Sequence, residues 1–268
     1  MSLSKNEFSP RHCMVVFAPY PLGETRVQRE AESLLCNGFF VDVICLRLPG
    51  DSSLDEYNGV KIYREKYRLP FTFMKGSRME MRFFQYFRFF FSAGFRLTKL
   101  HFQNKYSSIQ VHNMPDFLVF CVIIPKLMGV PVILDLHDLM PELFNGNFGK
   151  STSLLARIIR WQERIACKFA NHVITVSEQW RQALINRGVP KNKCCVVMNV
   201  ADERIFQPIQ YKSLRSMEDD SFRLLYYGTI RERFGLDIAI RAVGMVKNDI
   251  PKIHLTLIGD GDYLSHLE

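Results

Sequence analysis

Polar residues follow a strand-like apolar run in the segment VHNMPDF. His112, Asn113 and Asp116 come directly after the run that ends near Val111. A histidine in this place can donate a hydrogen bond to a substrate hydroxyl or phosphate, or transfer a proton. Asp116 has a structural alternative, as the N-cap of a helix that starts at Phe117. We therefore take His112 as the candidate catalytic residue and expect Asn113 and Asp116 to line a polar cleft.

A second polar cluster follows the next strand-like run, in the segment LDLHDLMPELF. It contains Asp135, His137, Asp138 and Glu142. No second histidine follows at the helical spacing of a zinc motif, so we expect no metal here. We expect His137, Asp138 and Glu142 to line the same cleft. The alternative is that Asp138 and Glu142 only start a helix and stabilise its dipole.

The loop after the first strand-like run offers a phosphate-binding candidate. Gly23 lies in the segment PYPLGE, just before a helical pattern. A glycine there can bring backbone N–H groups close to a phosphate at the N-terminus of the helix. No G-x-G-x-x-G dinucleotide fingerprint is present, and a plain connecting loop is the structural alternative.

A basic turn lies in the segment FRLLYYGTIRERFGLDIAIRAV, which covers residues 222–243. The segment consists of a buried strand, a glycine turn and an amphipathic helix. Arg231 and Arg233 carry guanidinium groups whose planar fork matches phosphate oxygens. We therefore expect them to bind the diphosphate of a donor; a solvated basic turn is the alternative.

Alternating strand and helix patterns must position these residues. The apolar runs predict strands at 14–18, 41–46, 60–63, 108–112, 132–136, 172–176, 195–198, 224–227 and 254–258. Helical patterns cover 25–36, 78–102, 117–128, 154–170 and 178–187. Repeated strand-helix-strand order predicts a doubly wound, Rossmann-like α/β domain over residues 1–206. A polar linker over 207–221 then leads to residues 222–268, which begin a second such domain.

The composition is that of a soluble globular protein, with 47% hydrophobic and 23% charged residues in 268. The longest apolar run, FLVFCVIIP, is too short to span a bilayer, and the N-terminus lacks the apolar core of a secretory signal. Seven cysteines without C-x-x-C spacing indicate reduced thiols. We therefore expect a cytoplasmic protein.

Positive charge is concentrated in one part of the chain. Residues 60–105 contain eleven Lys/Arg and two Glu, a local net charge of +9 in a chain of net charge +8. The helical pattern over 78–102 combines this charge with phenylalanines and a polar stripe that includes Gln85. We interpret it as a membrane-surface helix that docks on an anionic inner leaflet; the alternative is that the phenylalanines pack on the sheet. The membrane-surface residues expected are Arg82, Phe87, Arg88, Phe91, Arg96 and Lys99. Nucleic acid is the rival partner, but no recognised nucleic-acid motif accompanies the patch.

Seven segments, taken in order, resemble the GT-B fold retaining glycosyltransferases of group 1, family 4. They are R-x-x-R-E-A-x-x-L-x-x-x-G from Arg26 to Gly38, VHNMPD, LDLHDLMPEL, VITVSE, NVADERIFQP, YYGTIRERFGLDIAIRAV and LTLIGDGDYLSHL. The resemblance implies an N-terminal acceptor-binding domain and a C-terminal domain that binds a nucleotide-diphosphate sugar. The family's histidine falls on His112 and its glycine loop on Gly23. Phe234 stands where the family commonly has a lysine, and the family's paired-glutamate motif should lie beyond the final segment.

The resemblance implies a glycosyltransferase that uses a UDP- or GDP-sugar, without a metal cofactor, to extend a glycan or lipid-linked glycan in cell-envelope polysaccharide synthesis. Two alternatives stay open: a non-catalytic acceptor-binding module that lacks its donor half, and a nucleotide-sugar epimerase. Because the chain begins a donor domain in its last 47 residues, we expect weak binding of UDP and GDP, or none.

Overall fold

The computed structural model describes residues 9–66, 79–143, 154–207 and 221–267. The chain divides into two compact units, residues 1–200 and 201–268. Most of the predicted linker lies outside the described residues, so the predicted domain limits stay predictions.

Unit 1 is built on an eight-stranded sheet in the order β3-β4-β2-β1-β5-β6-β7-β8. The strands are β1 (Arg11–Val15), β2 (Phe40–Arg47), β3 (Leu54–Tyr57), β4 (Val60–Lys66), β5 (Ser108–His112), β6 (Val132–Leu136), β7 (His172–Thr175) and β8 (Cys194–Val196). Every neighbouring pair is parallel except β3 and β4. The mostly parallel α/β fold predicted from the sequence is therefore confirmed.

Three elements differ from the predictions. Strand β3 escapes prediction because its residues are all exposed and form no apolar run. Strand β1 begins at Arg11 because its polar first residues pair with β2 and β5. The helix predicted at 117–128 is a 3-10 helix, η2 (Asp116–Val122), followed by α3 (Ile123–Leu127). Pro125 lies in the first turn of α3, where its missing N–H costs no helical hydrogen bond.

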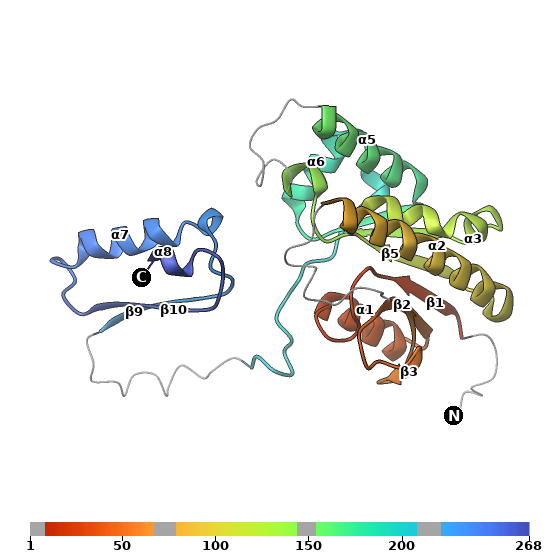
Figure 1. The fold of residues 1–268 in the computed structure, drawn as a ribbon, viewed down its shortest axis with the longest axis horizontal. Coiled ribbons are helices and arrows are strands. Elements are labelled where there is room, and N and C mark those ends of the chain that lie inside the picture. Colours follow the sequence, from red (N-terminus) through yellow and green to blue (C-terminus); the bar gives the residue numbers. More distant parts are fainter. Residues whose placement is uncertain (1–8, 67–78, 144–153, 208–220, 268) are drawn as a thin grey trace. The chain divides into compact units, whose positions relative to one another are not determined.

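Helices cover the sheet unequally on its two faces. The remaining elements of unit 1 are α1 (Thr25–Cys36), α2 (Met79–Asn104), α5 (Leu154–Phe169), α6 (Glu178–Asn186) and η3 (Lys191–Lys193). On one face, Val27 and Ala31 of α1 pack on Met14 and Val43. On the other face, α2, η2, α5 and α6 enclose the larger apolar core. Figure 1 shows α2, α3 and α5 grouped in this second layer.

Unit 2 contains a two-stranded parallel sheet and short helices. Its elements are β9 (Phe222–Tyr227), η5 (Glu232–Phe234), α7 (Leu236–Val246), β10 (Ile253–Ile258) and α8 (Leu264–Leu267). The turn after β10 packs backbone on backbone against the turn after β9. A Cβ at Gly259 would lie 1.8 Å from the Gly228 oxygen, and one at Gly261 would lie 1.9 Å from the Ile230 oxygen. The glycines of the GDG segment are therefore required by close packing.

Two further features are the character of the helices and the state of the cysteines. Among the described helices, none has both the length and the apolar character needed to cross a bilayer. All seven cysteines lie in the described residues, and each is a free thiol.

Candidate functional site

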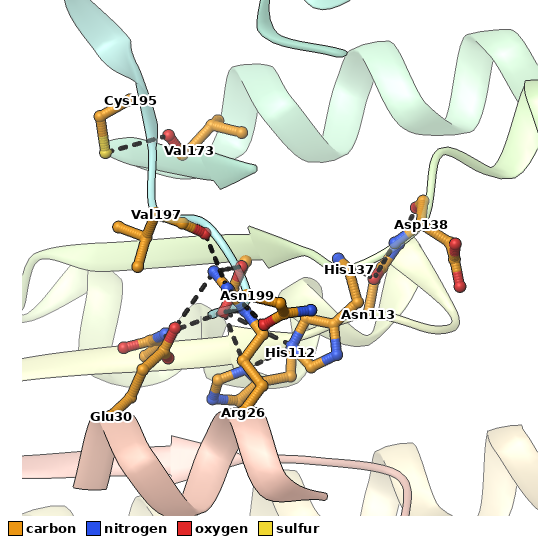
Figure 2. A network of polar contacts seen from close by, with 12 residues as sticks. Arg26, Glu30, His112, Asn113, His137, Asp138, Val173, Cys195, Val197 and Asn199 are labelled. Carbon is orange, nitrogen blue, oxygen red and sulfur yellow. Dashed lines mark hydrogen bonds and ion pairs between the residues drawn. The ribbon is translucent and has the colours of Figure 1, made fainter. Parts of the chain in front are cut away.

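The carboxyl ends of β5 and β6 and the first turn of α1 meet at one edge of the sheet in unit 1. Parallel pairing sets His112 of β5 beside Asp135 of β6. Figure 2 shows Arg26 and Glu30 projecting from α1 toward His112 and Asn199. Because α/β folds bind ligands at the carboxyl ends of parallel strands, this edge is the candidate site.

A buried ion pair between Arg26 and Asp135 lies at the centre of the site. Arg26 Nε donates to Asp135 Oδ2 and Nη2 donates to Oδ1, each over 2.9 Å. The two side chains are 6% and 0% exposed. Two parallel charge-assisted hydrogen bonds compensate for part of the cost of burying both charges. The pair fixes α1 against β6.

Arginines of α1 also bind the chain after β8. Arg26 Nη1 donates to the backbone oxygen of Val197 over 2.8 Å and to Asn199 Oδ1 over 3.1 Å. Arg29 donates to the backbone oxygen of Val200. The segment 197–200 is therefore held next to the first turns of α1.

Two histidines approach the same carboxylate oxygen. His112 Nδ1 lies 3.2 Å and His137 Nε2 lies 3.4 Å from Asp135 Oδ2. These two ring nitrogens are 3.0 Å apart, and the rings meet edge to face. His112 is fully buried, whereas His137 is 18% exposed. His137 is thus the ring of the pair that reaches solvent.

The network sets the charge state of its members. Burial lowers the pKa of His112, despite the neighbouring Asp135 carboxylate, so the ring is neutral. Burial would raise the pKa of Asp135, but hydrogen bonds from His112, His137 and Arg26 lower it overall. A neutral His112 that donates through Nδ1 keeps Nε2 as an acceptor. Within the described residues this buried Nε2 has no partner.

Asn113 joins the ends of β5 and β6 through both ends of its amide. Its Nδ2 donates to the backbone oxygen of Asp138 over 2.6 Å and to Asp116 Oδ1 over 3.0 Å. Its Oδ1 accepts from the N–H of His137 over 2.8 Å. Asp116 is 1% exposed, and burial raises its pKa to about 6. Asp116 therefore contacts Asn113 inside the fold rather than solvent, while Asp138 is half-buried at the edge.

A cavity of about 530 Å³ adjoins the network on the α1 side of the sheet. Gln110 Nε2 connects the two, because it donates to Glu30 Oε2 over 2.7 Å and lies 3.3 Å from Asp135 Oδ2. Burial, followed by the charge of Asp135, raises the pKa of Glu30 to about 7. Part of the carboxylate charge beside the cavity therefore titrates near neutral pH. The apolar lining residues are Leu34, Phe39, Ile133, Ile174, Val197, Met198 and Val200.

Three members of the network could also be considered as metal ligands. The ligand atoms of His112, Asp135 and His137 lie within 4.8 Å of one another. However, both oxygens of Asp135 accept hydrogen bonds from Arg26, whose guanidinium is permanently charged. That positive charge opposes a cation at the same carboxylate. The donor set fits a hydrogen-bond network better than a metal site.

Among the described residues, Gly23 and Glu142 form no hydrogen bond or ion pair with this network. Gly23 is exposed in the loop before α1, with a φ of +95° and open space around the position of a Cβ. The next residue, Glu24, places Oε2 3.9 Å from His137 Nδ1. Glu142 lies in helical residues 140–143 and forms an exposed ion pair with Arg187 at 3.0 Å. Glu142 therefore lies in a surface ion pair, and its predicted place in a cleft with His137 stays a prediction.

The basic turn of unit 2 presents its guanidinium groups to solvent. Arg231 is 50% exposed and lies 4.0 Å from Asp262 Oδ1. The Arg233 guanidinium lies over the Phe234 ring, 5.0 Å from its centroid. Gly235, with a φ of +66°, then starts α7. Two exposed cations before a helix N-terminus form a surface that suits an anion.

Exposed phenylalanines run along the outer surface of α2. Phe84, Phe87, Phe91 and Phe95 are 68%, 53%, 68% and 77% exposed. Their spacing places them on one side of the helix. Gln85, expected on a polar stripe, is instead buried, because that part of the helix turns toward the sheet. The phenylalanine stripe, rather than a polar one, therefore faces outward.

The predicted basic residues of α2 are divided around this stripe. Lys99 is exposed and Arg88 is half-buried. Arg96 is 39% exposed and forms an ion pair with Glu65 of β4, so its charge is partly neutralised. The side chain of Arg82 lies outside the described residues.

Sequence reasoning missed the Arg26–Asp135 pair, although a signal for it existed. Asp135 and Gln110 interrupt apolar strands, and a buried carboxylate needs a partner. The sequence alone does not identify the partner of Asp135, because Arg26 lies 109 positions away.

Residues 23–204 match a family model described as Glycosyltransferase Family 4. The matched region contains the whole network around Asp135. It ends before β9, so the family match concerns unit 1 almost entirely.

Two curated fungal proteins are similar to parts of the chain. Both are described as chitobiosyldiphosphodolichol beta-mannosyltransferase. The protein from Debaryomyces hansenii is 22% identical over 172 residues, which are 63% of this chain and 34% of that protein. The protein from Candida glabrata is 30% identical over 116 residues, 41% of this chain and 25% of that protein. The chain thus spans about a third or less of these relatives.

Solved structures share the fold at low sequence identity. The catalytic domain of starch synthase IV from Arabidopsis thaliana, bound to ADP and acarbose, has a TM-score of 0.61 at 12% identity. That match covers 97% of this chain and 70% of the other. Anabaena HepE in complex with UDP has a TM-score of 0.58 at 16% identity, over 96% and 64%. These likenesses show the mixed α/β fold of GT-B type.

Proposed function

Because the chain belongs to Glycosyltransferase Family 4, we propose that the protein transfers a sugar from a nucleotide-diphosphate donor to a glycan or lipid-linked glycan. The observation that carries this proposal is the family match over residues 23–204, which contains the polar network at the sheet edge. The proposal includes retention of anomeric configuration and a role in cell-envelope polysaccharide synthesis.

The donor and acceptor classes are proposed from the similar proteins and from the basic turn. The solved structures hold ADP or UDP, and the curated relatives are named for mannosyl transfer to a lipid diphosphate glycan. We propose by analogy that this protein uses a UDP- or GDP-sugar donor and a lipid-linked acceptor. Arg231 and Arg233 would bind the donor diphosphate and stabilise its growing charge as it leaves. No metal ion is needed for that role.

The sheet edge of unit 1 offers further groups for substrate binding. His112 offers a buried Nε2 that has no partner among the described residues and can accept a hydrogen bond from a sugar hydroxyl. Gly23 offers exposed backbone close to the first turn of α1. Asn113, His137 and Asp138 line the edge beside them. Exclusion of water from this edge is required, because water would hydrolyse the donor.

Membrane attachment through α2 completes the proposal. The exposed phenylalanines Phe84, Phe87, Phe91 and Phe95 and the exposed Lys99 give this helix the apolar and basic character of an interfacial element. Docking on the anionic inner leaflet would bring unit 1 to a lipid-linked acceptor, with the protein peripheral on the cytoplasmic side.

A transfer assay tests the proposed activity. The chain is incubated with UDP- and GDP-sugars and a polyprenyl diphosphate glycan, and products are identified by mass spectrometry. We expect transfer from one donor to be slow, in line with the weak donor binding expected of this chain, and to be lost in the His112→Ala and Arg231→Ala/Arg233→Ala variants. Wild-type-level transfer by the arginine variant would overturn the diphosphate role. The anomeric configuration of the product, read by NMR, tests retention separately.

A further inference from the structure

Helix α5 exposes a row of large apolar side chains. Leu154, Ile158 and Trp161 are 71%, 47% and 62% exposed. Half-buried Ile165 continues the row. The spacing of four, three and four residues places them on one side of the helix. Ala166 and Cys167 face the opposite way into the core, so the apolar row points away from the sheet.

The same helix carries positive charge beside this row. Its four exposed cations, at i, i+3, i+7 and i+11, are Arg157, Arg160, Arg164 and Lys168. The sole acid in its sequence, Glu163, is 2% exposed and pairs with Arg187 at 3.1 Å. The solvent-facing side of α5 is therefore apolar and cationic, without a carboxylate from the helix itself.

A groove of about 500 Å³ adjoins the cationic side of α5. Trp161, Arg164 and Lys168 line it from the helix, and Lys193 lines it from η3. Lys193 Nζ is held at 3.0 Å from the backbone oxygen of Lys168. No described lining residue is acidic. Three cations around a recess that opens beside an exposed tryptophan suit an anionic group at an apolar boundary.

From this geometry, we propose that the outer face of α5 is a second contact with an anionic bilayer, with the groove beside Trp161 receiving lipid phosphates. The proposal rests on the membrane docking proposed for α2. Both helices pack into the core on the same face of the sheet. Figure 1 shows α2 and α5 in the same helical layer.

Charge complementarity selects a lipid surface as the occupant. An amphipathic helix with a basic face and an exposed Trp matches the interfacial class of helices. Each Lys or Arg near an anionic surface adds favourable energy, and two contacts on one rigid unit reinforce each other. Two contact lines would also fix how unit 1 is tilted on the membrane, which one helix cannot do.

Vesicle flotation with the full 268-residue chain tests the proposal. Vesicles of phosphatidylcholine with 30% phosphatidylglycerol are compared with pure phosphatidylcholine at low and high salt. Arg164→Glu/Lys168→Glu changes two groove cations. Lys247→Glu/Lys252→Glu makes a matched charge change at two exposed positions of unit 2. Trp161→Ala tests the apolar row. Circular dichroism verifies that each variant is folded.

We expect the groove variant to bind anionic vesicles about tenfold more weakly than the wild type, and the unit 2 variant to bind nearly as well. Trp161→Ala should weaken binding to anionic vesicles by the same factor at low and at high salt. If the wild type floats and the groove variant floats equally, the α5 proposal is overturned and docking through α2 stands. If the wild type does not float, docking through α2 fails as well. A chain that sediments as a dimer, and becomes monomeric with Trp161→Ala, assigns the face to a second copy and overturns the proposal.

Discussion

Arg26 of α1 and Asp135 of β6, which are 109 positions apart in the sequence, form two parallel hydrogen bonds of 2.9 Å. The carboxylate that Arg26 holds is the same one that His112 and His137 approach. One ion pair therefore determines both how α1 packs and how the two histidines are arranged.

Replacing Asp135 with Asn should destabilise unit 1 by about 3–5 kcal/mol, because it leaves the buried Arg26 guanidinium without a counter-charge. Urea unfolding followed by tryptophan fluorescence measures this. Trp161 and Trp180 are the protein's two tryptophans, so the signal reports unit 1 alone. The matched control is Glu178→Gln, since Glu178 is 69% exposed in its pair with Arg181. The control should lower the free energy of unfolding by less than about 1 kcal/mol. An equal loss of stability in the two variants would contradict the central role of the Arg26–Asp135 pair.

Glu163 should make unit 1 less stable as pH rises through neutrality. Burial, together with the charges of Asp116 and Glu142, raises its pKa from 4.5 to about 7, against the opposing charge of Arg187. Between those values the unfolded chain has lost the proton and the folded chain keeps it, so the free energy of unfolding falls with rising pH. From pH 5 to 8 the wild type should lose about 2 kcal/mol more than Glu163→Gln. Tryptophan-monitored unfolding at several pH values checks this. An equal loss in the two proteins would show that Arg187 keeps the carboxylate charged.

The sequence predicts the strands that carry the site better than it predicts the site itself. Strands β5 and β6 have the predicted bounds, because their apolar residues, such as Ile109, Val111 and Leu134, are buried in the sheet. Strand register and helix placement determine on which side of the sheet a polar residue lies and which residue it pairs with. His112 is therefore located correctly along the chain, yet its enclosure behind a fixed carboxylate network emerges only from the fold.

The surface of α2 illustrates the same limit. The residue pattern predicts a helix over 78–102, and the structure has one over Met79–Asn104. The eight phenylalanines of α2 exceed the needs of one core face, but the pattern does not decide which of them pack. In the structure Phe89 is buried, while Phe87 and Phe91 are exposed. Arg96 turns to Glu65, so its expected membrane role is reduced by a partner that the sequence does not reveal.

Phe87→Ser/Phe91→Ser should weaken binding to anionic vesicles with little loss of stability. The two rings are more than half exposed, so unfolding removes little apolar contact, whereas insertion into an interface would bury both. Flotation measures the binding and urea unfolding measures the stability. Phe40→Ser is the matched control, because Phe40 is 52% exposed on β2 rather than α2. Equal flotation of all three proteins would rule out docking through the phenylalanine stripe.

The basic turn of unit 2 should contribute to nucleotide binding through Arg231 and Arg233. Calorimetry with UDP and GDP at low salt should show weak binding by this chain, or none. If binding is measurable, Arg231→Ala/Arg233→Ala should weaken it by about tenfold or more, because each guanidinium offers charge-assisted hydrogen bonds to phosphate oxygens. Arg241→Ala is the control in the same unit, since Arg241 is 73% exposed on α7 and pairs with Asp237. Binding should also weaken with added salt, as expected for exposed charges. Tight binding that persists in the double variant, or an equal loss in Arg241→Ala, would show that the turn does not recognise the diphosphate.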